Sequence, residues 1–114
     1  MTSGAGERTD PLEGCCVPVT ESALSMEAAT EVASVLAALG DPVRLRLFSI
    51  VASEGEVCSC SLEGPLERSQ PTISHHTSVL AAAGLLVGEK RGKWMWWRVE
   101  QEQLARVRRV LGGP

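Results

Sequence analysis

The sequence SQPTISHHTSVLAAAG, residues 69–84, carries the clearest structural pattern of the chain. It predicts a helix, because Ser69 is a favourable N-cap, Pro71 suits a first turn and Gly84 suits a C-cap. Its apolar positions, among them Ile73, can face a core. The other side is a stripe of short hydrogen-bonding side chains: Gln70, Thr72, Ser74, His75 and Ser78. A helix that reads base edges in a DNA groove needs such a stripe, whereas a buried helix does not.

Three helices are predicted before this stretch. Residues 25–39 have apolar side chains at helical spacing, and Gly40 ends that helix. Asp41 is an N-cap for a second, mostly buried helix, whose first position is a proline. A third helix over residues 61–67 is short, because it contains an internal Gly-Pro pair. The apolar sets of the first and second helices include two leucines, Leu36 and Leu45.

A β-hairpin and a final helix are predicted after residues 69–84. Residues 85–87 and 94–99 are apolar and aromatic runs, and residues 88–93 between them predict a basic tip. The three tryptophans of the second run are expected in the hairpin core. A helix over residues 100–111 places three apolar side chains on one side: Leu104, Val107 and Leu111. This order of elements predicts a mainly α fold with a small β-hairpin, a winged helix-turn-helix domain that forms a homodimer through its N- and C-terminal helices.

Length and composition predict one compact domain with a tail. The chain has 114 residues, of which 44% are hydrophobic, an ordinary share for a globular protein. Residues 1–21 are rich in Gly, Thr, Pro and acidic side chains, so they predict a flexible arm, and residues 22–114 form the domain. We find no stretch suited to spanning a membrane and no secretory signal, so we expect a cytoplasmic protein without a membrane partner.

Charge is distributed unevenly along the chain. Residues 1–67 hold three Arg or Lys against eleven Asp or Glu, a net charge of −8, and residues 68–114 hold eight against three, a net charge of +5. The sum of −8 and +5 is the overall net charge of −3. The positive half contains the polar-striped helix and the hairpin, as expected for a face that binds phosphates.

Four cysteines carry the candidate chemistry. In a reducing compartment such thiols serve metal binding or redox sensing more often than structural disulfides. Cys58 and Cys60 directly precede the short third helix, and thiolates are soft ligands that suit As(III), Sb(III), Cd(II), Pb(II) and Zn(II). Two sulfurs are too few for these ions, and the other candidates are Cys15 and Cys16. We therefore expect the arm to fold back and complete a site of Cys15, Cys16, Cys58 and Cys60.

Four motifs in one order resemble the ArsR/SmtB family of metal-responsive repressors. They are LGDPVRLRL (39–47), VCSC (57–60), SQPTISHH (69–76) and AGLL (83–86), and the resemblance covers about residues 25–111. It implies a homodimeric repressor that binds double-stranded operator DNA when metal-free and leaves it when As(III) or Sb(III) binds the thiolates. Arsenical repressors of the family carry a Cys-x-Cys matched by Cys58 and Cys60. Cadmium and lead repressors add arm cysteines, so Cd(II), Pb(II) or Zn(II) stay open as inducers.

The predicted DNA contacts lie on the polar-striped helix and the hairpin. We expect the helix to contact base edges or phosphates, and basic residues of the hairpin to neutralise the backbone. The predicted set is Gln70, Thr72, Ser74 and His75 with Arg91 and Lys93. Family members often have Leu-Lys after the His-His pair, where this chain has Thr77-Ser78, so its helix is less basic. Of the two histidines, His76 is the stronger candidate for packing beneath the helix.

The cysteines bear on two other functions. A thiol-redox repressor is an alternative, because the vicinal pair Cys15-Cys16 can be oxidised. An enzyme such as an arsenate reductase is not expected. A phosphatase-like cradle needs Cys-x5-Arg, but Gly64 and Leu66 stand at that distance from Cys58 and Cys60. No Cys-x-x-Cys occurs, and no small organic substrate is expected. A structural zinc site is disfavoured as well, because the usual spacing within a ligand pair is absent.

Overall fold

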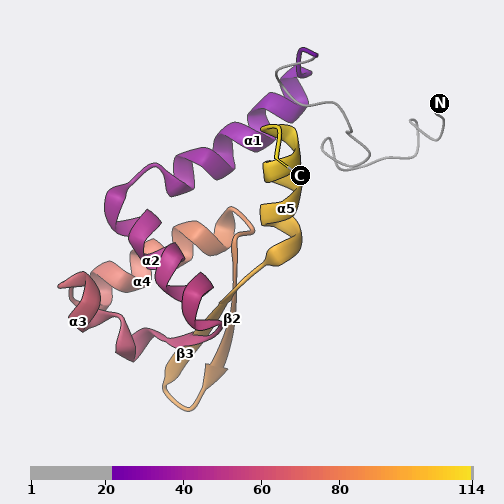
Figure 1. Ribbon diagram of the computed structural model, residues 1–114. Helices are drawn as coiled ribbons and strands as arrows, with labels where there is room; N and C mark the ends of the chain where they lie inside the picture. The colour runs from indigo at the N-terminus through magenta and orange to yellow at the C-terminus, as the bar shows by residue number, and fades with distance from the viewer. Residues whose placement is uncertain (1–21, 114) are drawn as a thin grey trace.

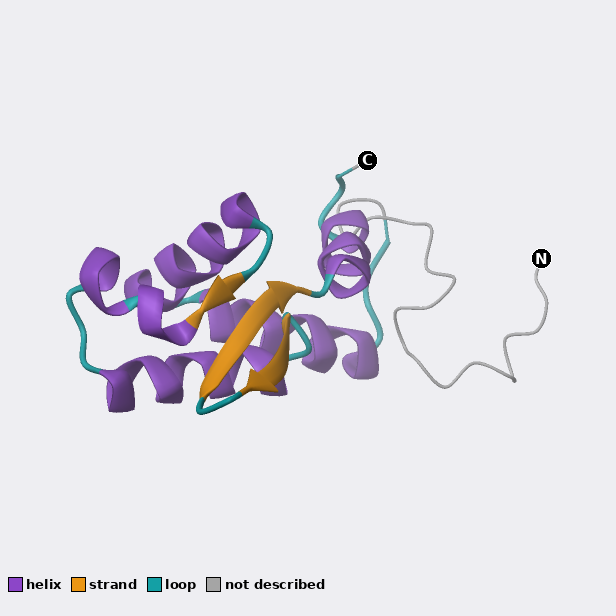
Figure 2. Cartoon of the chain, turned by 90° about the horizontal axis from the view of Figure 1, so that it is seen from below, coloured by secondary structure: helices purple, strands orange, loops and turns teal. Residues whose placement is uncertain are grey.

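The computed structural model describes residues 22–113, which form a mainly helical fold with a small antiparallel sheet (Figure 1). Three strands are paired in the order β1-β3-β2. The elements are α1 (Met26–Leu39), α2 (Pro42–Glu54), β1 (Val57–Cys58), the 3-10 turn η2 (Ser59–Ser61), α3 (Glu63–Leu66), α4 (Gln70–Ala82), β2 (Leu86–Arg91), β3 (Trp94–Val99) and α5 (Gln101–Val110). Figure 2 shows the short strands among helices that make up most of the domain.

The predicted helices are confirmed, and local capping explains where they begin. Ser25 Oγ accepts a hydrogen bond from the Ala28 amide at 3.1 Å, which caps α1. Asp41 Oδ2 accepts from the Val43 and Arg44 amides at 3.0 Å, which caps α2. Ser69 has the extended backbone of an N-cap before α4, but its side chain makes no capping hydrogen bond.

The hairpin is confirmed, but its tip is shorter than predicted. Strand β2 continues to Arg91, which pairs with Trp94, so Gly92 and Lys93 alone form the turn. Gly92 has φ +65°, the left-handed conformation that two-residue hairpin turns require at such a position. Gly88, predicted in the tip, pairs with Trp97, and a Cβ at Gly88 would lie 2.6 Å from an indole carbon of that residue. The absence of a side chain at residue 88 lets the indole pack across β2.

A third strand was not predicted. β1 has only two residues, and Val57 pairs with Trp97 on the other side of β3 from Gly88. Trp97 is buried, and Trp94 and Trp96 are half-buried, so the prediction that these aromatic side chains pack in the hairpin core is confirmed for Trp97 above all. The pairing attaches the segment before η2 to the wing.

The core lies between α1, α2, α4 and the sheet. Its fully buried side chains include Leu47, Leu62, Ile73, Leu80 and Leu85. The prediction that Leu36 and Leu45 face inward is wrong, since they are 42% and 51% exposed. The prediction that Leu111 lies on the buried side of α5 is also wrong, since Leu111 is 49% exposed and Val110 fills the buried position. Among the residues that the structure describes, no other element covers these side chains.

One buried polar side chain joins α5 to the end of α4. Gln103 is 7% exposed and donates from Nε2 to the carbonyl oxygen of Ala83 at 2.9 Å. The next residue, Gly84, has φ +78° and reverses the chain into β2. Figure 1 places α1 and α5 at one end of the domain and the β2–β3 hairpin at the other. Within residues 22–113, no helix is long and apolar enough to cross a membrane.

Candidate DNA-binding surface and thiol site

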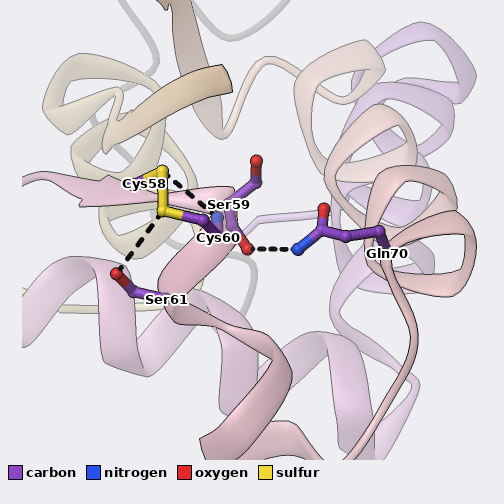
Figure 3. Close-up of a disulfide and its surroundings, with 5 residues drawn as sticks. All are labelled: Cys58, Ser59, Cys60, Ser61 and Gln70. Carbon is purple, nitrogen blue, oxygen red and sulfur yellow. Dashed lines mark hydrogen bonds between the residues drawn. A yellow bond between two sulfur atoms is a disulfide. The ribbon is translucent and has the colours of Figure 1, made fainter. Parts of the chain in front are cut away.

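The two predicted thiol ligands of the domain lie side by side. Cys58 ends β1 and is 3% exposed, whereas Cys60 lies in η2 and is exposed. The Cys60 amide donates to Cys58 Sγ at 3.2 Å, so Cys58 caps η2. Figure 3 shows the two sulfurs joined in a disulfide. The structure thus presents the oxidised pair, and both sulfurs must be reduced to thiolates before they can ligate an ion.

The other half of the predicted metal site is not described. Cys15 and Cys16 lie outside residues 22–113. In that range, no group of three or more His, Cys, Asp or Glu side chains is arranged to hold a metal ion. The four-thiolate site therefore stays a prediction, and what the structure brings together is the Cys58–Cys60 pair.

The segment between the cysteines contacts the start of α4. Ser59 is 8% exposed, and its carbonyl oxygen accepts a hydrogen bond from Gln70 Nε2 at 2.8 Å (Figure 3). Gln70 is the first residue of α4 and is half-buried. Beside this contact, a groove of about 600 Å³ opens between α4 and the wing, lined among others by Ser59, Gln70, Ser74, Trp94 and Trp97. The side-chain amide of Gln70, a predicted DNA contact, is therefore hydrogen-bonded to the segment that carries the thiols.

The other residues of the polar stripe differ in solvent exposure. Ser74 and His75 are exposed, Thr72 is half-buried, and the hydroxyl of Thr72 lies 3.4 Å from that of Ser69. Thr77 is buried and donates from Oγ1 to the Ser74 carbonyl at 3.1 Å, so it belongs to the core side of the helix. The outer face of α4 is therefore formed by short polar side chains, and α4 contains no Lys, Arg, Asp or Glu.

His76, the stronger of the two histidines as a candidate for an inward position, packs inward. It is half-buried, and Arg44 Nη1 donates to its Nδ1 at 3.4 Å. Burial lowers the pKa of His76, and a neutral ring agrees with an acceptor at Nδ1. The Arg44 guanidinium also donates from Nε to the Ala38 carbonyl at 2.7 Å. Arg44, a residue of α2, thereby connects α1 with α4.

Arg91 on the wing is held by two carboxylates. Its Nη2 lies 2.7 Å from Glu56 Oε2 and 2.9 Å from Glu89 Oε1, and its guanidinium carbon lies 5.0 Å from the ring centroid of Trp96. The hydrogen bond from Arg91 holds the pKa of Glu89 below its usual value. Lys93 is exposed at the turn, with Nζ 5.7 Å from the centroid of Trp94. Of the two predicted phosphate contacts, Lys93 has no carboxylate within salt-bridge distance in the described part of the chain.

Comparison with known proteins places this arrangement in a family. Residues 41–86, from the cap of α2 to the start of β2, match the family described as bacterial regulatory protein, arsR family. The chain is 39% identical to the arsenic resistance transcriptional regulator ArsR1 of Pseudomonas putida, over 69% of this chain and 62% of that protein. It is 35% identical to the arsenical resistance operon repressor of Escherichia coli K12, over 64% of this chain and 78% of that protein.

Solved structures agree with these relatives. An ArsR-like transcriptional regulator from Rhodococcus sp. RHA1 is 30% identical and superposes with a TM-score of 0.65, over 74% of this chain and 78% of that one. The homodimeric winged helix-turn-helix DNA-binding domain of a possible ArsR-family regulator from Mycobacterium bovis is 25% identical, with a TM-score of 0.61 over 75% of this chain and 82% of that one. The family consists of transcriptional regulators and not of enzymes. With its winged helix-turn-helix fold and these relatives, the chain belongs to the ArsR family of bacterial transcriptional regulators.

Proposed function

We propose that this ArsR-family regulator is a homodimeric repressor that binds operator DNA when metal-free and is released when As(III) or Sb(III) binds its cysteine thiolates. The observation that carries the proposal is the position of the Cys58–Cys60 pair, which lies next to the first residue of α4. The names of the relatives from P. putida and E. coli support an arsenical as the inducer. The segment that carries the thiols and the proposed DNA-binding helix thus lie in direct contact, through Ser59 and Gln70.

The proposed DNA surface combines α4 with the wing. Thr72, Ser74 and His75 are available for base edges or phosphates, and Lys93 for the backbone. Gln70 and Arg91 belong to the predicted set too, but each must leave an internal partner to reach DNA. The absence of Lys and Arg from α4 favours an affinity that depends on the wing and on pairing of two subunits.

The proposed dimer uses α1 and α5. Met26 is 80% exposed, Leu36 is 42% exposed and Leu111 is 49% exposed, and these three apolar side chains belong to α1 or to the cap of α5. Both helices lie at the end of the domain away from the wing (Figure 1). Covering these side chains with the same surface of a second subunit removes them from water and places one α4 on each side of a two-fold axis.

The ligand set needs sulfurs that the domain alone does not supply. As(III) requires a third thiolate beyond Cys58 and Cys60, and we propose that Cys15 or Cys16 provides it, from the same chain or from a partner subunit. Four sulfurs suit Cd(II) or Pb(II) equally well on chemical grounds, so these ions, with Zn(II), form the alternative inducers of the same mechanism.

An anaerobic titration tests this function. The wild type and the four single Cys→Ser variants are titrated with arsenite, antimonite, Cd(II), Pb(II) and Zn(II), with thiolate absorption and operator binding followed together. We expect Cys58→Ser and Cys60→Ser to stay on DNA at arsenite concentrations that release the wild type. Ser53→Ala, an exposed change at the end of α2 and outside the polar stripe, is the control. Normal release of Cys58→Ser by arsenite contradicts the proposed site.

Oxidation is a second candidate signal, favoured by the Cys58–Cys60 disulfide. With hydrogen peroxide as oxidant, two S–H bonds break, the two thiols give up two protons and two electrons, one S–S bond forms, and the peroxide takes them up and is reduced to two water molecules. A redox repressor would release DNA on peroxide treatment and rebind after a dithiol reductant is added, with no response to arsenite. An arsenite response without a peroxide response favours the metalloid.

A further inference from the structure

We infer that Gln70 is a positioning residue that transmits the state of the Cys58–Cys60 segment to α4, and not a residue that reads a base. The inference rests on the proposed function, since it names the route by which ligand binding at the thiols reaches the DNA-binding helix. It is carried by a single peptide group, the one between Ser59 and Cys60.

This peptide group makes a hydrogen bond at each end. Its N–H, from Cys60, donates to Cys58 Sγ at 3.2 Å, and its carbonyl oxygen, from Ser59, accepts from Gln70 Nε2 at 2.8 Å. A peptide unit is planar, so its N–H and C=O turn together. Any rotation that takes the N–H away from the sulfur therefore takes the carbonyl oxygen away from Gln70.

Ligand binding acts on the sulfur end of the group. A thiolate keeps other lone pairs when it donates one to a metalloid, so ligation does not remove this acceptor but fixes where it lies. A Cys58 sulfur drawn toward an ion shared with Cys60 changes its position relative to the Cys60 N–H. The peptide plane is then free to tilt, and the distance from the Ser59 oxygen to Gln70 changes.

The hydrogen bond between the Ser59 oxygen and Gln70 is shielded from water and joins η2 to α4. Ser59 is 8% exposed, and its oxygen also accepts the Leu62 amide at 3.2 Å, so this acceptor sits inside the η2 turn and away from bulk water. Gln70 opens α4 and is half-buried, and its contact partner lies eleven residues earlier in the chain. Loss of the contact releases the first turn of α4, the part of the helix that also carries Thr72.

The experiment measures coupling and not only binding. The operator dissociation constant is determined for the reduced protein with and without saturating arsenite, and the ratio of the two constants is the coupling. We expect Gln70→Leu, which keeps the side-chain volume and lacks the donor, to lower this ratio roughly three- to tenfold, the effect of one neutral hydrogen bond. Gln70→Ala should lower it equally, which guards against a packing effect of leucine. Ser59→Ala keeps the carbonyl acceptor and should keep the ratio.

Three readouts accompany the ratio: thiolate absorption for arsenite binding, DNA affinity without arsenite, and the melting temperature. Retained arsenite binding, and a metal-free DNA affinity that falls by the same factor as the ratio while the affinity with arsenite stays, support the inference, because the variant lacks the contact in both states. A ratio equal to that of the wild type overturns it; if the DNA affinity has then fallen equally with and without arsenite, Gln70 is a DNA contact. If arsenite does not release the wild type from DNA, the proposed function fails, and the inference fails with it. If arsenite releases the wild type and the Gln70 variants with the same ratio, only the inference fails.

Discussion

The wing should bind DNA more tightly when Arg91 is freed from its carboxylates. In the wild type, Glu56 and Glu89 contribute two negative charges and Arg91 one positive charge, so the cluster carries a net charge of −1. The double variant Glu56→Gln/Glu89→Gln changes this to +1 and leaves the guanidinium near the tip without a charged partner. Both ion pairs are on the surface, with side-chain exposures of 39–67%, so we expect the fold to persist.

The magnitude follows from counterion release. One cation that neutralises one additional phosphate steepens the slope of log K against log salt by about 0.9. Lowering the salt concentration from 200 mM to 50 mM should then increase the affinity of the variant by roughly 3.5-fold more than that of the wild type. The effect should be the same on operator and non-operator DNA, because a phosphate contact carries no sequence information.

Fluorescence anisotropy with a labelled operator, at four or five salt concentrations between these limits, measures both slopes. The control is Glu27→Gln/Glu102→Gln, which makes the same change in net charge on exposed residues of α1 and α5. A steeper slope in the wing variant alone supports a phosphate contact. Equal slopes in the wild type and the wing variant would refute the reasoning, because Arg91 would then not face DNA in the complex.

Three further predictions concern stability. Burial lowers the pKa of His76 from 6.5, so the folded state resists protonation, and the stability that is present above pH 6.5 is lost as the pH falls through the folded pKa. Between pH 7.5 and 5.5, the free energy of unfolding in urea should therefore fall less in His76→Gln than in the wild type. Equal losses would exclude His76 as the cause. Gly88→Ala should destabilise the fold by about 1–3 kcal/mol, because the new Cβ would lie 2.6 Å from an indole carbon of Trp97. Gly64→Ala is the control, since a Cβ there would meet nothing within 4 Å. Equal melting temperatures of the two variants would contradict this. Gln103→Leu leaves the Ala83 carbonyl without its donor and should cost about 1–3 kcal/mol by chemical denaturation, with an unchanged midpoint as the contrary result.

Local signals in the sequence accounted for the helices. Asp41 and Gly40 mark ends of α2 and α1 through hydrogen bonds made within a few residues, so sequence alone locates them. β1 gave no such signal, because a two-residue strand is specified only by its pairing with Trp97, forty residues later along the chain in register with Val57. Leu36 looked like a core residue because helical spacing identifies an apolar side but not what covers it.

The candidate site was predicted by residue type but not by contact. Cys58 and Cys60 were identified because soft ligands at close spacing are informative by themselves. The internal partners of two predicted DNA contacts could not be anticipated: Gln70 bonds a carbonyl eleven residues away, and Arg91 bonds a carboxylate thirty-five residues away. Such contacts depend on the tertiary packing of η2 and the wing, for which a single sequence holds no periodic pattern.

Arg44 has a consequence for how sharply a dimer would respond. Its guanidinium donates hydrogen bonds to a carbonyl at the end of α1 and to the ring of His76 in α4. When α4 tilts, these bonds therefore either resist the tilt or move α1 with it. If α1 is shared between two subunits, a ligand that tilts one α4 alters the interface on which the other subunit depends. The dose–response curve for release from DNA would then have a Hill coefficient above one, and the regulated genes would switch over a narrow range of inducer concentration.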